Sequence, residues 1–191
     1  MLRYARGDVG AFEELLARHR RPLFGYLCRM LKNAELAEDI FQEVFIRVMK
    51  ARTRYKKTAK FSTWLYRIAH NTCVDALRRE NYRRTESLSE PRKTRADSEM
   101  TLEDALPSPN PGPDVELERR EFSETLRMCL ERLSPEQREV FALRQYQNLP
   151  FKEIARATGT SESTVKSRMR YALKSLRGML VAEKIVEEVT T

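Results

Sequence analysis

Apolar side chains recur at three- and four-residue steps over most of this chain, a spacing typical of amphipathic helices. The first predicted helix is capped by Asp8 and ends near Lys32, and Pro22 inside it is expected to kink or split it. A second helix is predicted after the Asn33-Ala34 turn, over residues 37–50, and a third over residues 63–84. The pattern therefore predicts a bundle of about four helices at the N-terminal end of the chain.

A basic stretch, RTRYKKTAK at residues 52–60, separates the last two of these helices. It has no apolar periodicity and is predicted to be a loop. Ser62 follows it and can cap the next helix. Trp64 lies in the apolar stripe of that helix, which favours a core position over a role in stacking on a partner.

The C-terminal part of the chain carries stronger local signals. The motif Leu133-Ser134-Pro135-Glu136-Gln137 predicts a helix start, because serine caps the helix, proline suits its first position and glutamine its third. Supporting helices are predicted over residues 122–133 and 139–146.

Residues 151–177, FKEIARATGTSESTVKSRMRYALKSLR, are predicted to form a helix-turn-helix. Gly159 can take the positive φ that the turn needs, and Ser161 can cap the second helix. One side of this second helix is an apolar stripe, made by Val165, Met169, Ala172, Leu173, Leu176 and Leu180. Another side is cationic, with Lys166, Arg170, Lys174 and Arg177. Such a helix suits the major groove of DNA, although an ordinary amphipathic helix with a solvated basic face has the same pattern.

The charge of the chain indicates a polyanionic partner. A net charge of +8 and a pI near 9.6 suggest either nucleic acid or an acidic membrane surface. No apolar run approaches the roughly 20 residues that span a bilayer, so membrane insertion is not expected. The polar opening of the chain is unlike a signal peptide, and its 3 cysteines include no CxxC pair. We therefore expect a cytoplasmic protein with reduced thiols.

Charge also divides the chain into parts. Residues 1–85 carry 19 Lys and Arg against 9 Asp and Glu, whereas residues 86–121 carry 5 against 10. This acidic stretch is rich in proline and poor in large apolar residues, so it is predicted to be an extended, flexible linker. Residues 122–180 would form a second helical domain and residues 181–191 a short tail. The prediction is an all-α fold of two small helical domains joined by an acidic, proline-containing linker.

The sequence offers no enzyme motif. It has no Gly-rich phosphate loop, no HExxH and no GxSxG. His70 and Cys73 lie three residues apart on a predicted helix and could share a metal ion, but no third ligand is near them in sequence. His19 lies alone among arginines. We predict no metal site, no cofactor and no catalytic residue.

Three motifs in this order resemble those of extracytoplasmic-function (ECF) sigma factors, the minimal two-domain initiation factors of bacterial RNA polymerase. They are AEDIFQEVFIRVMK, FSTWLYRIAHNTCVDALRR and the helix-turn-helix, with the acidic stretch before the last. The resemblance covers nearly the whole chain, with region 2 over residues 9–85 and region 4 over residues 122–180. It implies a DNA-binding protein, not an enzyme, that binds core polymerase, recognises the minus-thirty-five and minus-ten promoter elements and promotes melting for transcription initiation.

The resemblance assigns the second helix to polymerase docking, against a coiled coil of the largest subunit, and gives region 4 the flap region as its partner. The docking residues it implies are Asp39, Gln42, Glu43, Phe45 and Arg47. From spacing alone, a core helix with a solvated charged face is the simpler interpretation. The resemblance of the AEDIFQEVF motif to the family favours polymerase docking instead.

The basic loop and the helix after it match the part of the family that opens minus-ten DNA. Strand opening needs cations for phosphates and an aromatic platform or pocket for an extruded base. The residues implied are Tyr55, Lys56, Lys57, Lys60, Phe61, Arg67, Asn71, Asp75, Arg78 and Arg79.

In region 4, the resemblance gives minus-thirty-five reading to Lys166, Ser167, Arg168 and Arg170. Lys152 and Lys174 are better placed for phosphates. An anti-sigma factor is a further candidate partner.

Two alternative functions would use parts of the same sequence pattern. One is a stand-alone helix-turn-helix regulator whose N-terminal domain senses or dimerises, and the other is a nucleic-acid enzyme of transposase-like or nuclease type.

Overall fold

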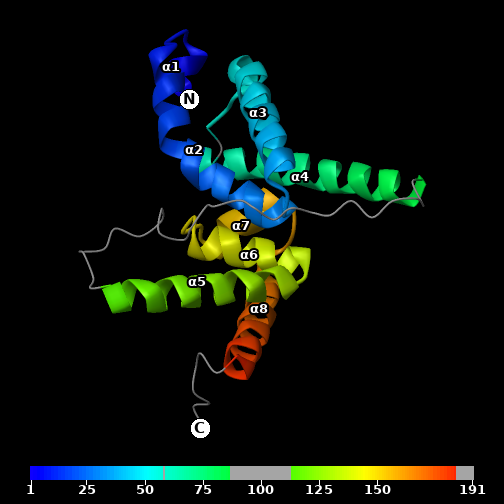
Figure 1. Cartoon of the computed structure of the whole chain (residues 1–191). Coiled ribbons are helices and arrows are strands. Elements are labelled where there is room, and N and C mark those ends of the chain that lie inside the picture. The colour runs from blue at the N-terminus through cyan, green and yellow to red at the C-terminus, as the bar shows by residue number, and fades with distance from the viewer. Residues whose placement is uncertain (58, 87–112, 184–191) are drawn as a thin grey trace.

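All regular elements of the computed structural model are helices, over the residues that it describes, 1–57, 59–86 and 113–183. The N-terminal module, residues 1–86, contains α1 (Leu2–Ala5), α2 (Gly10–Leu31), α3 (Ala34–Lys50), the 3-10 helix η1 (Arg52–Arg54) and α4 (Phe61–Glu86). The C-terminal module, residues 113–183, contains α5 (Pro113–Arg132), α6 (Pro135–Gln145), α7 (Phe151–Thr158) and α8 (Glu162–Ala182). Figure 1 shows the two modules one above the other. The predicted all-α, two-domain fold is confirmed for the described residues.

Side-chain oxygens precede the first two long helices of the N-terminal module. The Asp8 carboxylate accepts a hydrogen bond from the Ala11 N–H at 3.1 Å, at the start that the sequence predicted. The Asn33 side chain, which the sequence placed in a turn, accepts one from the Leu36 N–H at 3.0 Å, and α3 therefore starts at Ala34, earlier than predicted. Helix α2 continues through Pro22, so the predicted division of this helix does not occur.

Two further helix starts differ from the sequence prediction. Helix α4 starts at Phe61 because the Lys60 carbonyl accepts from the Trp64 N–H at 3.2 Å. Ser62 therefore lies inside the first turn and is not its cap. Helix α5 starts at Pro113, within the stretch that composition assigned to the linker, where proline suits a first helical position. The rest of that predicted linker and most of the predicted tail lie outside the described residues.

The caps and the turn of the C-terminal module follow the sequence closely. The Ser134 hydroxyl accepts from the Gln137 N–H at 3.3 Å, and the Ser161 hydroxyl accepts from the Thr164 N–H at 3.0 Å. Gly159 ends α7 with φ of 67°, in the left-handed region that favours glycine. The predicted helix-turn-helix is therefore present, formed by α7 and α8.

The buried stripe of α8 is narrower than its apolar pattern suggests. Val165, Met169, Ala172 and Leu176 are buried, whereas Leu173 is 47% exposed. Leu173 lies about 100° around the helix from Ala172, which turns it away from the core. The prediction that Leu173 belongs to the buried stripe is wrong.

The two modules pack directly against each other. Helix α4 lies against α7 and α2 against α6, and one continuous cluster of buried side chains runs through both modules. Figure 1 shows α6 and α7 directly beneath α2 and α4. The sequence prediction contained no contact between the two domains, so this packing is new information from the structure.

Candidate nucleic-acid interface

The cationic face of α8 is open to solvent. The predicted reading residues on it are the exposed Lys166, Arg170 and Lys174 and the half-buried Ser167 and Arg168. Glu162, one turn before Lys166, forms an ion pair with the Lys166 ammonium at 2.8 Å. The Arg170 guanidinium lies over the exposed ring of Tyr171, 5.2 Å from the ring centre. The face presents positive charge over about two helical turns, which suits phosphate and base contacts in a major groove.

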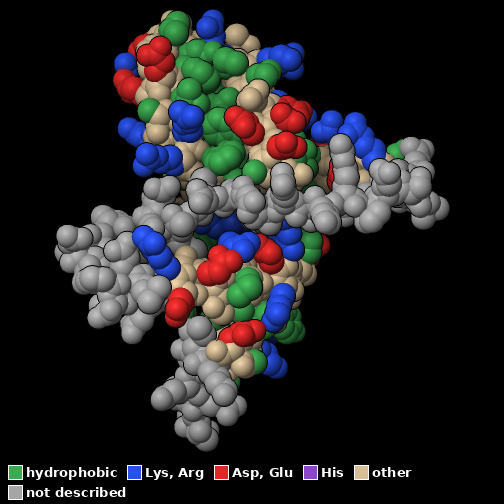
Figure 2. Space-filling model, in the orientation of Figure 1, with side chains coloured by type: hydrophobic (Ala, Val, Ile, Leu, Met, Phe, Trp, Pro, Cys, Tyr) green, Lys and Arg blue, Asp and Glu red, His purple; other side chains and the backbone are tan. Residues whose placement is uncertain are grey.

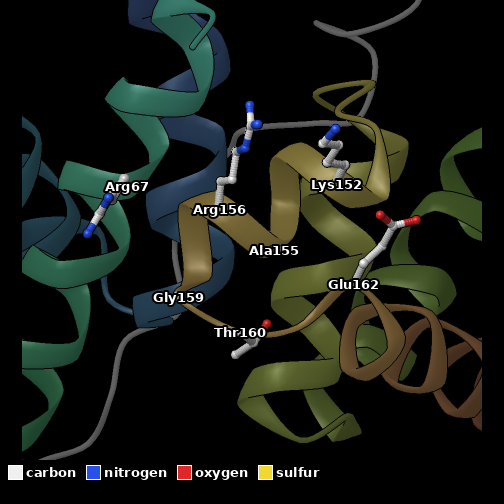
Figure 3. A pocket seen from close by; sticks show the side chains of 7 residues that line it. All are labelled: Arg67, Lys152, Ala155, Arg156, Gly159, Thr160 and Glu162. Atoms are coloured by element: carbon white, nitrogen blue, oxygen red, sulfur yellow. The ribbon is translucent and has the colours of Figure 1, made fainter. Parts of the chain in front are cut away.

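A shallow pocket of about 390 Å³ lies where α4, α7 and the turn before α8 meet (Figure 3). Its cations come from both modules, with Arg67 on α4 and Lys152 and Arg156 on α7. Arg156, which sequence reasoning did not single out, is paired with Glu153 at 3.2 Å. The structure thus places Arg67 and Lys152, predicted for different promoter elements, on one pocket.

A cluster of aromatic rings joins the basic loop to the start of α4. The ring centre of Tyr55 lies 5.0 Å from that of Trp64 and 6.4 Å from that of Phe61, and Phe61 lies 5.7 Å from Trp64. All three side chains are half-buried, and burial raises the pKa of Tyr55. Trp64 therefore belongs partly to the core and partly to a surface cluster. The loop cations beside it, Lys56, Lys57 and Lys60, are exposed.

The remaining minus-ten residues lie along the exposed surface of α4, namely Arg67, Asn71, Asp75, Arg78 and Arg79. Arg79 also donates to the Asp75 carbonyl at 3.3 Å and approaches Glu43 of α3 at 3.9 Å. This helix therefore carries its polar residues on an exposed surface that follows directly after the aromatic cluster.

The docking residues predicted on α3 divide into surface and core. Asp39 and Gln42 are exposed, and Glu43 accepts from Arg47 at 2.6 Å. Phe45 is only 5% exposed and packs in the module core, so it cannot meet a partner directly while that core stays packed. Helix α3 has this wider buried side because it packs against both α2 and α4.

Sequence reasoning missed two apolar side chains on the surface of α3. Ile46 is 43% exposed and Met49 is 40% exposed. Each is an apolar residue outside the predicted buried stripe of its helix, and this position was the signal in the sequence for an exposed apolar side chain. Figure 2 shows further apolar side chains gathered on one face of the N-terminal module, with charged side chains around them. Such a surface suits burial against a protein partner.

A buried polar cluster between the modules was also missed. The Glu139 carboxylate of α6, 4% exposed, accepts from the Tyr26 hydroxyl of α2 at 2.6 Å and lies 2.6 Å from His70 Nδ1 of α4. Burial, and then the charge of Glu139, raise the pKa of Tyr26 well above its ordinary value and likewise that of the nearby Cys73 thiol. Tyr26 therefore stays protonated and able to donate.

The His70–Cys73 pair does not belong to a metal centre in the part of the chain that the structure describes. No three His, Cys, Asp or Glu side chains gather there in a way that could hold an ion. Among the same residues, no helix is long and apolar enough to cross a membrane.

Comparison with known families matches both modules. Residues 15–83 match the family model of Sigma-70 region 2, and residues 123–176 match that of Sigma-70, region 4.

Similar proteins match over nearly the full length. RNA polymerase sigma factor CarQ of Myxococcus xanthus is 32% identical over 94% of this chain and 95% of its own. ECF RNA polymerase sigma factor SigK of Mycobacterium ulcerans is 31% identical over 93% of this chain and 90% of its own. Among solved structures, the sigma factor RpoE in complex with the anti-sigma factor NepR from Bartonella quintana has the same fold. Its TM-score is 0.66 at 20% identity, over 90% of this chain and 98% of that one.

Proposed function

Because this chain belongs to the ECF sigma factors of bacterial RNA polymerase, we propose how its surfaces divide the work of promoter recognition. The chain is a sigma factor whose partners are core polymerase and promoter DNA. We propose that it acts in the cytoplasm and has no enzymatic activity of its own. The observation that carries the assignment of surfaces is the helix-turn-helix of α7 and α8, with its open cationic face.

The C-terminal module reads the minus-thirty-five element in this proposal. Ser167, Arg168 and Arg170 lie where α8 can reach base edges, and Lys166 accompanies them. Lys152 and Lys174 lie nearer the ends of the surface and contact phosphates. The support is the exposure of the four cations Lys152, Lys166, Arg170 and Lys174.

The N-terminal module binds and opens minus-ten DNA. The half-buried rings of Tyr55 and Phe61 form the platform or pocket wall for an extruded base, and the lysines of the loop hold phosphates. The residues from Arg67 to Arg79 on α4 extend this surface along the strand. In this proposal region 2 spans residues 1–85 and region 4 spans residues 122–180, and α5, which starts at Pro113, leads into region 4.

Polymerase docking falls to the exposed side of α3. Asp39, Gln42, Glu43 and Arg47 supply polar contacts that set register, and Ile46 supplies apolar burial. Phe45 supports this surface from the core. The RpoE–NepR complex, of the same fold, makes an anti-sigma factor a partner to test for.

Run-off transcription with core polymerase tests the proposal. The full chain should direct specific initiation, whereas a variant with Asp39, Gln42 and Glu43 changed to Ala should lose polymerase association and transcription with its helical circular dichroism intact. Glu13→Ala, an exposed acidic position on α2, is the matched control and should behave as the parent chain. If the full chain binds DNA specifically but never associates with polymerase in a pull-down, a stand-alone regulator is favoured.

A further inference from the structure

Tyr4 of α1 connects the core of the N-terminal module to the beginning of the basic loop. Its ring centre lies 5.0 Å from that of Phe12 on α2, and Phe12 lies 6.2 Å from Phe45 of the module core. The Arg52 guanidinium lies over the Tyr4 ring, 5.3 Å from its centre. Helix η1, which begins at Arg52, contacts both α1 and α3, and Figure 1 shows α1 at the same end of the module as the last turn of α3. A continuous series of contacts therefore joins the core to the loop.

Helix α1 is held in place mainly by the burial of Tyr4. A helix of four residues is not stable by itself, so it needs packing against its neighbours. Arg3 forms ion pairs with Asp8 at 2.8 Å and with Glu14 at 3.3 Å, but its side chain is 64% exposed, and exposed ion pairs stabilise little. Tyr4, in contrast, is only 8% exposed. The Tyr4 ring is thus both the anchor of α1 and the surface on which Arg52 rests.

Arg52 differs from the lysines of the basic loop. Lys56, Lys57 and Lys60 are exposed, whereas Arg52 is half-buried with its guanidinium over an aromatic ring, where the ring attracts a cation. The other end of the loop is held by the cluster of Tyr55 with the residues that begin α4. The loop is therefore supported at both ends, and a loop that is already ordered loses less conformational entropy when it captures a base.

We propose that Tyr4 is a positioning residue for promoter opening, which acts by holding Arg52 and with it the conformation of the basic loop. Because Tyr4 is buried, it acts through the loop and not by contact with DNA. This positioning role rests on the proposed function of the basic loop, whereas the contact between Tyr4 and Arg52 is a property of the fold.

Hydrogen exchange in the full chain tests whether Tyr4 holds the loop. The Arg54 N–H of η1 donates to the Ala51 carbonyl at 3.1 Å. Tyr4→Ala removes the ring beneath Arg52, so exchange of this amide should accelerate about twofold to thirtyfold, while the amides of α3 keep their protection. Leu2→Ala is the matched control, because Leu2 lies on the same helix and is 44% exposed. Leu2→Ala, and Tyr4→Phe, which keeps a ring under the guanidinium, should exchange like the parent chain.

Permanganate footprinting with core polymerase tests whether the held loop is what opens DNA. Tyr4→Ala should lower the reactivity of minus-ten thymines several-fold on a duplex promoter, and Tyr4→Phe should restore it. Polymerase affinity should stay at its parental value, because Tyr4 lies away from the exposed side of α3. If Tyr4→Ala disturbs folding, Arg52→Gln removes the same contact from the side of the loop and should have the same two effects. The double variant should then be no more impaired than the more impaired single variant, because both changes remove one contact.

Three outcomes would overturn the positioning role. They are unchanged exchange of the Arg54 amide in Tyr4→Ala, acceleration shared equally by the amides of α3, and faster exchange of the loop with parental permanganate reactivity. Normal reactivity after replacement of the whole loop by a Gly/Ser segment would instead refute the proposed function of the loop. Hydrogen exchange would still show in that case whether Tyr4 holds the loop.

Discussion

The left-handed turn between α7 and α8 gives a prediction whose size can be worked out. Gly159 has φ of 67°, and a Cβ added there would meet no atom within 4 Å. The whole cost of Gly159→Ala is therefore backbone strain, about 1–2 kcal/mol for a residue with a side chain in this region. The unfolded alanine chain has less entropy, which offsets about 0.4–1 kcal/mol. A net loss of about 1 kcal/mol in the free energy of unfolding is expected.

Urea unfolding followed by circular dichroism measures this loss, and fluorescence anisotropy with a minus-thirty-five duplex measures its effect on binding. Because the strained turn sets the angle between α7 and α8, DNA affinity should fall as well. Gly7→Ala is a matched control, since its φ is 105° and its Cβ would also meet nothing. It should lose at least as much stability and keep its DNA affinity. Gly178→Ala, in open space on α8, should gain up to about 1 kcal/mol.

Two results would refute the reasoning. A Gly159→Ala chain as stable as its parent would mean that the turn does not need the left-handed conformation. Equal losses of DNA affinity in the Gly7 and Gly159 variants would mean that the effect is global instability and not the geometry of the helix-turn-helix.

Three further predictions concern DNA and pH. Arg168→Ala should weaken minus-thirty-five binding by about 1–3 kcal/mol and relax the preference at one base. Lys174→Ala should lower affinity evenly for all sequences and reduce by about 1 the slope of the logarithm of affinity against the logarithm of salt concentration. Binding to a library of duplexes at several salt concentrations distinguishes the two effects. Replacing residues 52–60 by a Gly/Ser segment should preserve polymerase binding but abolish permanganate reactivity of minus-ten thymines on duplex promoter, and normal reactivity would place melting elsewhere. Burial first, then Arg18, lowers the pKa of His19, so the unfolded chain binds more protons between that pKa and 6.5 and stability should fall as pH drops through this window. His19→Gln should flatten this slope in urea titrations at a series of pH values.

Local signals in the sequence predicted the elements well. Ser134, Gly159 and Ser161 each act within four residues of their own position, so the pattern alone locates the C-terminal helices. The predicted cap at Ser62 was wrong because α4 starts at Phe61, two residues before the predicted start. Leu173 was wrongly placed in the buried stripe of α8, because it is apolar but lies about 100° around the helix from the buried Ala172.

Long-range packing was beyond the reach of such signals. Tyr26 and Glu139 are 113 residues apart, and each taken alone is an ordinary residue of an amphipathic helix. Phe45 was assigned to the docking surface by the family resemblance, whereas the contact of α3 with both α2 and α4 buries it. The candidate DNA-contacting residues, by contrast, are largely at the surface as expected, because charge and exposure follow from the helical pattern.

The buried cluster of Tyr26, Glu139 and His70 is shared between the two modules, and this has a consequence for chimeric sigma factors. Transplanting residues 113–183 into another family member would carry α8 and with it the preference for a minus-thirty-five sequence. It would also set Glu139 opposite whatever side chains the recipient has in place of Tyr26 and His70. Promoter preference would then come from one parent, while the packing between the modules would belong to neither. Exchanging those two recipient positions together with the module is the way to transfer a promoter specificity and keep the partners of the buried Glu139.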